Sequence, residues 1–175
     1  MEAVLIAQLQ DPSTREKAFR ELVKTYQEKL YFHIRHFVYQ HEDANDVLQN
    51  TFIKIWNGID NFRGESSLYT WVYKIAMNES LTYMSKVRKM NVVDIEKIPV
   101  ADRGTSDSVN ADQLQLKLDK ALAQLPDRQR QVFIMRYYDE LSYEQMSEIL
   151  ETSQGALKAS YHHAVKKIEE FILSH

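Results

Sequence analysis

Residues 142–167 read SYEQMSEILETSQGALKASYHHAVKK, and this stretch indicates the fold most directly. It opens with a capping box, in which Ser142 and Gln145 satisfy the free backbone groups at a helix start. Apolar residues then recur at helical spacing, in a short run and in a longer run after residue 153. The short run is Met146, Ile149 and Leu150, and the longer one is Leu157, Tyr161, Val165, Ile168 and Ile172. A short helix, a turn and a longer helix predict a helix-turn-helix.

The longer helix has two chemically different faces when successive residues are placed about 100° apart. One face carries the apolar residues, and the opposite face carries small side chains, lysines and histidines. Small side chains let a helix approach base edges closely, while lysines further along reach phosphates. The candidate DNA-contacting residues are Lys158, Ala159, His162, His163 and Lys166. A polar outer face is also normal for a surface helix, so this pattern by itself leaves an ordinary helical bundle open.

The whole chain predicts an all-α protein of two small helical domains joined by a flexible linker, because Gly and Pro are scarce and apolar residues recur at helical spacing. The first domain, residues 1–90, is expected to hold three helices. An S-x-x-E capping box at Ser13 opens the first helix, and Gly58 in a left-handed conformation ends the second. Ser66 or Ser67 is expected to cap the third helix.

The linker is predicted over residues 91–112, where the periodicity is lost around Pro99, Gly104 and a run rich in Ser, Thr and Asp. Periodicity returns in residues 113–175, which predict a four-helix helix-turn-helix domain. Within that domain Pro126 separates two helices, and Asp127 is expected to cap the second of them.

A short polar loop precedes the third helix and combines an amide, an arginine, a glycine and hydroxyls. Such a loop suits an extruded base, because polar groups read the base edge while glycine lets the backbone approach. The candidate residues are Asn61, Arg63, Gly64, Glu65 and Ser66, with Lys74, Lys86, Arg88 and Lys89 of the next helix as candidate phosphate contacts. Trp71 lies on the apolar stripe of that helix, so we expect it in the core rather than stacked on a base. The four basic residues are also what a solvated helix face carries.

The net charge of −3 argues against a protein that simply coats DNA, but the charge is locally uneven. Residues 139–151 hold five acidic residues and no basic one, whereas residues 154–168 hold three lysines and no acidic one. A local basic stripe is enough to contact phosphates.

No cysteine occurs, which removes disulfides and thiolate metal sites. His33, His36 and His41 do not share a helix face with a carboxylate at metal spacing, and no catalytic motif occurs. We therefore expect neither an enzyme nor a metal or cofactor site. Residues 1–11 lack the pattern of a signal peptide, and no run of about 18 apolar residues occurs, so we expect a cytoplasmic protein without membrane insertion.

Several runs of the chain resemble segments of the sigma-70 family of RNA polymerase sigma factors, in the order in which that family has them. Residues 46–56 (DVLQNTFIKIW) resemble the polymerase-binding segment, and residues 62–78 (FRGESSLYTWVYKIAMN) resemble the promoter-melting segment. Residues 125–149 resemble the C-terminal domain, and residues 155–164 resemble its recognition helix. The length is similar to that of the extracytoplasmic-function class, which keeps only two of the usual domains.

The resemblance implies a sigma factor that binds core RNA polymerase and directs promoter-specific transcription initiation. The first domain would bind the clamp helices of the β′ subunit and capture a flipped non-template base of the −10 element, thereby aiding strand opening. The second domain would bind the β flap and read the −35 element. The implied polymerase-binding residues are Asp46, Gln49, Asn50 and Phe52. Such factors are commonly held inactive by an anti-sigma protein, which is often membrane-anchored.

The chain departs from the family pattern at three of these positions. The family usually has an acidic residue where Asn50 stands, and it often has arginines where Ser160 and His163 stand. The resemblance therefore implies no particular −35 sequence. From the residues themselves two other classes stay open: a dimeric helix-turn-helix regulator that binds a palindromic site without polymerase, and a helical interaction protein that contacts no DNA.

Overall fold

The computed structural model describes residues 1–90 and 109–175, with side chains from 1–90 and 111–175. Within this part the chain is helical and has no strand, which confirms the all-α prediction. It divides into two compact units, Met1–Lys89 and Met90–His175, and each is described by itself. Most of the predicted linker, namely residues 91–108, lies outside the described residues, and helix α5 begins at Val109.

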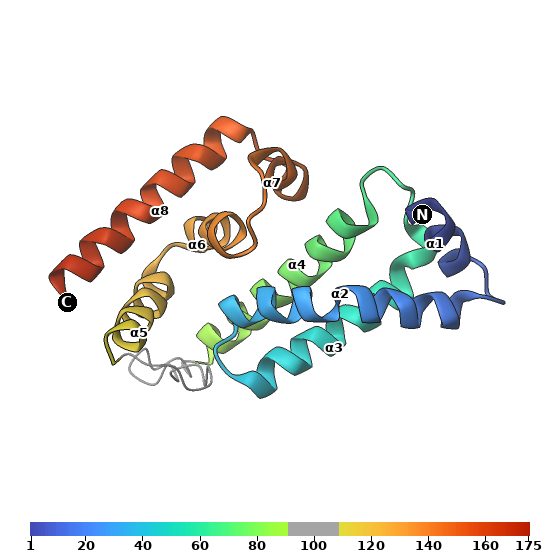
Figure 1. Ribbon diagram of the computed structural model, residues 1–175, viewed down its shortest axis with the longest axis horizontal. Coiled ribbons are helices and arrows are strands. Elements are labelled where there is room, and N and C mark those ends of the chain that lie inside the picture. Colours follow the sequence, from blue (N-terminus) through green and yellow to red (C-terminus); the bar gives the residue numbers. More distant parts are fainter. Residues whose placement is uncertain (91–108) are drawn as a thin grey trace. The chain divides into compact units, whose positions relative to one another are not determined.

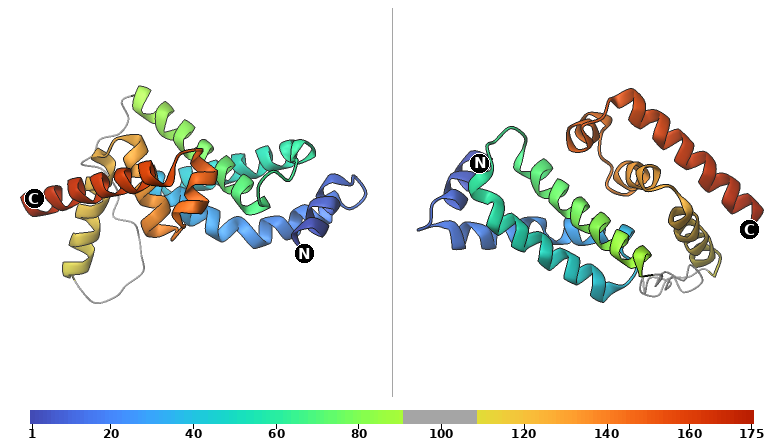
Figure 2. Two further views of the ribbon diagram at one scale, coloured as in Figure 1. Left: turned by 90° about the horizontal axis from the view of Figure 1, so that it is seen from above. Right: turned by 180° about the vertical axis from the view of Figure 1, so that it is seen from behind.

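The first unit is built on three long helices that run alongside one another, with a short fourth helix at one end (Figures 1 and 2). The elements are α1 (Glu2–Gln10), α2 (Arg15–Phe37), α3 (His41–Gly58), the 3-10 turn η1 (Ile59–Asn61) and α4 (Leu68–Lys89). Apolar stripes of the three long helices meet in the core, whose buried members include Leu22, Leu30, Ile34, Phe37, Val47, Ile55, Val72, Tyr73, Ala76 and Met77. Burial of such stripes supplies most of the stability of helices in a bundle.

The prediction of three helices in this unit is wrong, because α1 precedes them. Only Leu9 of this nine-residue helix is fully buried, and its apolar residues form no clear stripe. A helix this short is marginal in isolation and depends on tertiary contacts, so the sequence pattern gave no signal for it.

The Ser13 capping box is also wrong. Helix α2 begins at Arg15, and the N–H and hydroxyl of Ser13 instead donate to the carboxylate of Asp11, at 2.9 and 2.8 Å. These two hydrogen bonds lower the pKa of Asp11. Glu16, the other half of the predicted box, pairs with Arg20 one turn along. The acceptor at Asp11 competes for Ser13 because α1 ends directly before it.

Gly58 does end α3 as predicted, but for a different reason. Its backbone is right-handed, with φ −97° and ψ −11°, and η1 continues the chain from it. A side chain at this position would place its Cβ 3.3 Å from the Trp71 ring. Gly58 therefore leaves room for the close approach of Trp71, which is half-buried and also packs on Phe62 with ring centroids 5.1 Å apart.

The second unit contains four α-helices within the described residues, in agreement with the expected four-helix domain. They are α5 (Val109–Gln124), α6 (Asp127–Phe133), α7 (Tyr143–Leu150) and α8 (Gln154–Ser174), with the π-helical turn η3 (Ile134–Tyr138) after α6. Its core joins α5, α6 and α8 through Ala121, Leu122, Leu125, Phe133, Ala164 and Ile168. The cap predicted at Asp127 is wrong: Pro126 occupies the N-cap position without a side-chain hydrogen bond, and Asp127 is the first helical residue.

The cap predicted at Ser142 is confirmed, and Ser153 supplies a further cap that was not predicted. Ser142 accepts from the N–H of Gln145 at 3.1 Å, while the Gln145 side chain accepts from the N–H of Ser142 at 2.9 Å. Ser153 accepts from the N–H of Ala156 at 3.2 Å and starts α8. Glu151, in a left-handed conformation with φ 52°, ends α7 and turns the chain toward α8. Local side-chain bonds therefore define the start of both helices of the helix-turn-helix.

Two absences among the described residues bear on other functions. None of the described helices is both long and apolar enough to cross a lipid bilayer. Among the same residues no group of three or more His, Asp or Glu side chains could hold a metal ion. His33 is buried with its Nδ1 2.8 Å from the Tyr73 hydroxyl, and His41 is hydrogen-bonded to Tyr31 on the surface.

Candidate nucleic-acid and polymerase interface

The exposed face of α8 carries all five residues predicted to contact the −35 element. Leu157, Ala164 and Ile168 are buried on the opposite side of the helix. The exposed five are Lys158, Ala159, His162, His163 and Lys166, and we call them the recognition face. The rings of His162 and His163 lie with centroids 6.0 Å apart. Within the part of the chain that the structure describes, neither Lys158 nor Lys166 forms an ion pair, so both ammonium groups can bind an anion.

Tyr143, in the first turn of α7, lies between two cations. The Lys158 ammonium is 5.5 Å from the centre of its ring, and the Arg136 guanidinium carbon is 4.9 Å from it. Arg136 is held in turn by a 2.9 Å hydrogen bond to the carbonyl of Leu141. A cation over an aromatic face is attracted by the ring quadrupole. One ring therefore orients two positive charges at the junction of α7 and α8.

The loop between η1 and α4, residues 62–67, is exposed in its middle and anchored at both ends. Arg63, Gly64 and Glu65 are exposed, and Gly64 has a left-handed backbone with φ 70°. Phe62, at one end, is only 7% exposed. Ser67, at the other end, caps α4 by accepting from the N–H of Thr70 at 3.1 Å. Asn61 is also exposed, whereas Ser66 is half-buried, so the loop brings four of its five predicted residues to the surface.

The four basic residues predicted to hold phosphates do not form one cluster. Lys86, Arg88 and Lys89 are exposed in the last turn of α4, where cations suit the helix dipole. Lys74 is half-buried and lies about 18 Å earlier along the helix axis, at a rise of about 1.5 Å per residue. Successive residues point about 100° apart, so Lys86, Arg88 and Lys89 do not share one direction. The four side chains are better described as a track along α4.

The exposed face of α3 carries three of the four residues implied to bind polymerase. Asp46, Gln49 and Asn50 are exposed, whereas Phe52 is half-buried and packs edge-on against Phe19 of α2, with centroids 6.2 Å apart. Phe52 therefore belongs partly to the packing between helices. Ile53, which is 51% exposed, adds an apolar side chain to this surface and was not predicted.

Tyr83 of α4 joins this helix to the N-terminal half of α3. Partial burial, a hydrogen bond to Asp43 and the charges of Asp43 and Asp46 together raise the pKa of Tyr83. Nearby, Lys54 of α3 is paired with Glu79 of α4, whose side chain is 12% exposed. These contacts fix the position of α3 against α4, which carries the candidate phosphate contacts.

Sequence reasoning missed Arg136, Tyr143, Ile53 and the whole of α1. Arg136 and Tyr143 come together with Lys158 only because η3, α7 and α8 pack against each other. Helical periodicity identifies which face of one helix is apolar, but it does not identify neighbours on a different helix. Ile53 was missed because a single exposed apolar residue is common on protein surfaces.

The two units match two known protein families. Residues 22–90 match Sigma-70 region 2, and residues 115–168 match Sigma-70, region 4. The chain is 32% identical over 168 residues to the ECF RNA polymerase sigma-E factor of Haemophilus influenzae, with 90% of this chain and 88% of that protein covered.

Two solved structures are also similar. The sigma factor RpoE in complex with the anti-sigma factor NepR, from Bartonella quintana, is 26% identical, with a TM-score of 0.68, and the match covers 89% of this chain and 97% of that chain. The structure of CnrH in complex with the cytosolic domain of CnrY has a TM-score of 0.73 at 21% identity, with 99% and 97% covered. At 21% identity, this second likeness shows the fold alone.

The chain therefore belongs to the extracytoplasmic-function sigma factors of the sigma-70 family. It acts with RNA polymerase in directing transcription initiation and is not itself a catalyst.

Proposed function

We propose that the three surfaces divide the work of initiation among them. The α3 face, formed by Asp46, Gln49, Asn50 and part of Phe52, binds the clamp helices of the β′ subunit. The loop 62–67, with Asn61 before it, captures a flipped non-template base of the −10 element, and the basic track on α4 holds backbone phosphates. The recognition face reads the −35 element, while the second unit also contacts the β flap.

The observation that carries this proposal is the recognition face. Five predicted residues share the exposed side of one helix that follows a capped turn, and the two lysines among them have no acidic partner in the described chain. Exposed cations without partners bind phosphate readily, because no internal ion pair has to break. Exposed imidazoles beside them donate to or accept from base edges.

The basic surfaces are small, so neither unit is expected to hold promoter DNA tightly without polymerase, since phosphate contacts supply much of the affinity. We further propose that an anti-sigma protein binds this chain and holds it inactive, because the similar sigma factor RpoE forms a complex with the anti-sigma factor NepR. The proposed place of action is the cytoplasm, where the polymerase is.

Run-off transcription tests the proposal. Purified core polymerase, the full chain and DNA from upstream of the chain's own gene should give discrete transcripts that require the chain. Arg63→Ala and Lys158→Ala should each lower promoter-directed transcripts by about tenfold, the effect of losing about 1.4 kcal/mol of interaction. Binding of the variants to core polymerase should stay near the wild-type level.

Two results would contradict the proposed roles. Equal loss of transcription and of polymerase binding would mean that Arg63 and Lys158 act through folding or docking rather than through DNA. Unchanged transcription in both variants would remove the loop and the recognition face from promoter recognition. Lys24→Ala, on the exposed surface of α2, serves as the matched loss of one positive charge.

A further inference from the structure

We propose that α1 and the turn after it hold the loop 62–67 in the shape that receives the displaced promoter base, with Glu2, Gln10 and Arg15 as positioning residues. The inference rests on the proposed function of the loop. It concerns a helix that precedes residues 22–90, the part that matches Sigma-70 region 2.

Gln10, the last residue of α1, fixes the beginning of the loop. Its side-chain amide donates to the carbonyl of Ile59 at 3.2 Å and to the carbonyl of Phe62 at 2.9 Å. Ile59 starts η1, and Phe62 is the residue from which the loop departs. One amide therefore bonds the backbone on both sides of the 3-10 turn.

Arg15 adds a second connection at the same end. Its guanidinium pairs with Asp60 of η1, and it also donates to the carbonyls of Leu9 at 2.8 Å and Gln10 at 3.4 Å. The Arg15 side chain is 18% exposed and that of Asp60 is 56% exposed, so solvent screens the charge pair in part, and the hydrogen bonds of Arg15 to the two carbonyls add to it. Arg15 therefore ties the last turn of α1 and η1 to the start of α2.

Glu2, at the other end of α1, fixes the end of the loop. Its carboxylate accepts from the N–H of Leu68 at 2.8 Å, and Leu68 is the first residue of α4. A carboxylate at a helix start is favourable because the free N–H groups there carry partial positive charge. Burial, and secondly this carboxylate, raise the pKa of Tyr26, which places Glu2 against α2 as well.

Helix α1 thus connects the two ends of the loop: Gln10 at its C-terminus contacts the beginning of the loop, and Glu2 at its N-terminus contacts the end. A helix of this length extends about 13 Å and is much stiffer than a loop. Within the described residues, Arg63, Gly64 and Glu65 form no hydrogen bond or ion pair, so the middle of the loop is not held by contacts of its own. Because its ends are fixed, the loop has fewer conformations to lose when a base binds. The smaller entropy cost strengthens binding.

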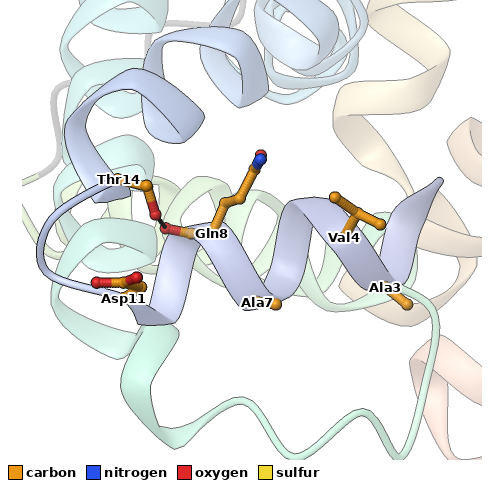
Figure 3. A pocket seen from close by; sticks show the side chains of 6 residues that line it. All are labelled: Ala3, Val4, Ala7, Gln8, Asp11 and Thr14. Carbon is orange, nitrogen blue, oxygen red and sulfur yellow. Dashed lines mark hydrogen bonds between the residues drawn. The ribbon is translucent and has the colours of Figure 1, made fainter.

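Gln8, an exposed residue of α1, offers a matched control. Gln8 lines a shallow surface depression of about 400 Å³ with Ala3, Val4 and Ala7, and Figure 3 shows its side chain pointing away from the turn. The hydrogen bond drawn there joins the Thr14 hydroxyl to the backbone carbonyl of Gln8, at 2.8 Å, and does not involve its side chain. Gln8→Leu and Gln10→Leu are therefore the same substitution on one helix, and only the second removes bonds to the loop.

The experiment measures stable complexes of the full chain with core polymerase by electrophoretic mobility shift of labelled DNA that carries the promoter found by run-off transcription. The DNA is supplied either as a duplex or with the −10 non-template strand already unpaired. We expect Gln10→Leu and Glu2→Leu each to lower stable complexes about fivefold on both DNA forms, the effect of losing one or two net hydrogen bonds. Gln8→Leu should match the wild type, and Glu2→Gln, which keeps an acceptor oxygen, should restore more than half of the loss.

The outcomes separate this inference from the proposed function of the loop. If Arg63→Ala lowers stable complexes but Gln10→Leu and Glu2→Leu behave like Gln8→Leu, α1 has no positioning role and the loop keeps its own. If Arg63→Ala has no effect either, both are wrong. Loss of polymerase binding in the α1 variants would also overturn the inference, because it indicates a general loss of structure. If Gln10→Leu fails to fold, the comparison of Glu2→Leu with Glu2→Gln decides the result, because Glu2 is exposed.

Discussion

Gly64 and Gly155 sit in opposite backbone conformations, and this difference decides what a methyl group does at each. Gly64, in the loop, has φ 70°, and no atom lies within 4 Å of the place where a Cβ would be. Gly155 is helical, in the first turn of α8, and is equally open. An alanine at position 64 therefore costs only backbone strain. An alanine at position 155 causes neither strain nor a clash.

We expect Gly64→Ala to destabilise the first unit by about 1 kcal/mol, the cost of a left-handed backbone for an L-residue. Gly155→Ala should instead stabilise the second unit by up to about 1 kcal/mol, because alanine favours a helix. Urea unfolding of the full chain measures both: Trp56 and Trp71 both lie in the first unit and report on Gly64, and far-ultraviolet circular dichroism reports on Gly155. A gain in stability from Gly64→Ala would contradict the assigned conformation.

Tyr83 gives a pH-dependent prediction at the same scale. Burial first, and then Asp43 and Asp46, raise its pKa above the ordinary 10.0, so the folded protein retains the phenolic proton more strongly than the unfolded chain. The stability that this supplies is fully present below pH 10.0 and is lost as the pH rises through the higher folded-state value. Ultraviolet titration of the wild type and of Tyr83→Phe should therefore differ by one phenolate, which forms above pH 10.0 in the wild type and is absent from the variant. If the phenolate that distinguishes the two proteins forms below pH 10.0, the result would count against the contact with Asp43.

The groups that cap the first turns of the helices come either from the adjacent chain or from another element. Ser142 and Ser153 each cap a helix by accepting from the N–H three residues along the chain, so both caps are local, and the pattern at Ser142 was sufficient to predict its cap. Helix α4 depends on a more distant residue as well, because the carboxylate of Glu2 accepts from its first N–H, that of Leu68. A cap supplied from another element is set by packing and leaves no local pattern.

We expect Ser142→Ala to destabilise the second unit by about 1 kcal/mol, because one helix-start N–H loses its acceptor. The exposed Ser85→Ala on α4 should change stability by less than about 0.5 kcal/mol, as surface substitutions usually do. Urea unfolding followed by circular dichroism compares the two. Equal effects would mean that the capping box contributes nothing specific.

For the whole molecule, charge placement matters more than the net charge of −3. The recognition face carries lysines and no acidic residue, although five acidic residues lie just before it in the sequence, over residues 139–151. Phosphate contacts release counterions, so their number appears in the salt dependence of binding. This quantity tests the recognition face through the complete complex with polymerase and DNA.

We expect Lys166→Ala to weaken promoter binding by the complex of this chain with core polymerase for all −35 sequences alike. The slope of log affinity against log salt should fall in magnitude by about 1, the effect of one lost phosphate contact. Fluorescence anisotropy of labelled promoter over a range of salt concentrations measures the slope. Lys24→Ala, also exposed, should leave it unchanged, and an unchanged slope in Lys166→Ala would remove this residue from phosphate binding.

Local sequence patterns were sufficient to predict the all-helical class, the helix-turn-helix with its Ser142 cap, and the face of α8 that is exposed. Each of these depends on residues within about four positions of one another, because helical period and capping are local. The match to region 2 and region 4 agrees with the family that these patterns resembled. The left-handed backbone of Gly64 was not predicted, although it is a conformation that favours glycine.

The meeting of residues that are distant in the sequence depends on the packing of the helices. Gln10 reaches the carbonyls of Ile59 and Phe62 across 49 and 52 residues of sequence, and Tyr143 gathers Arg136 and Lys158 from two other elements. The close approach of Trp71 to Gly58 is likewise visible only in the folded structure. Such contacts depend on how whole helices pack, and packing is a property of the complete core rather than of any local pattern.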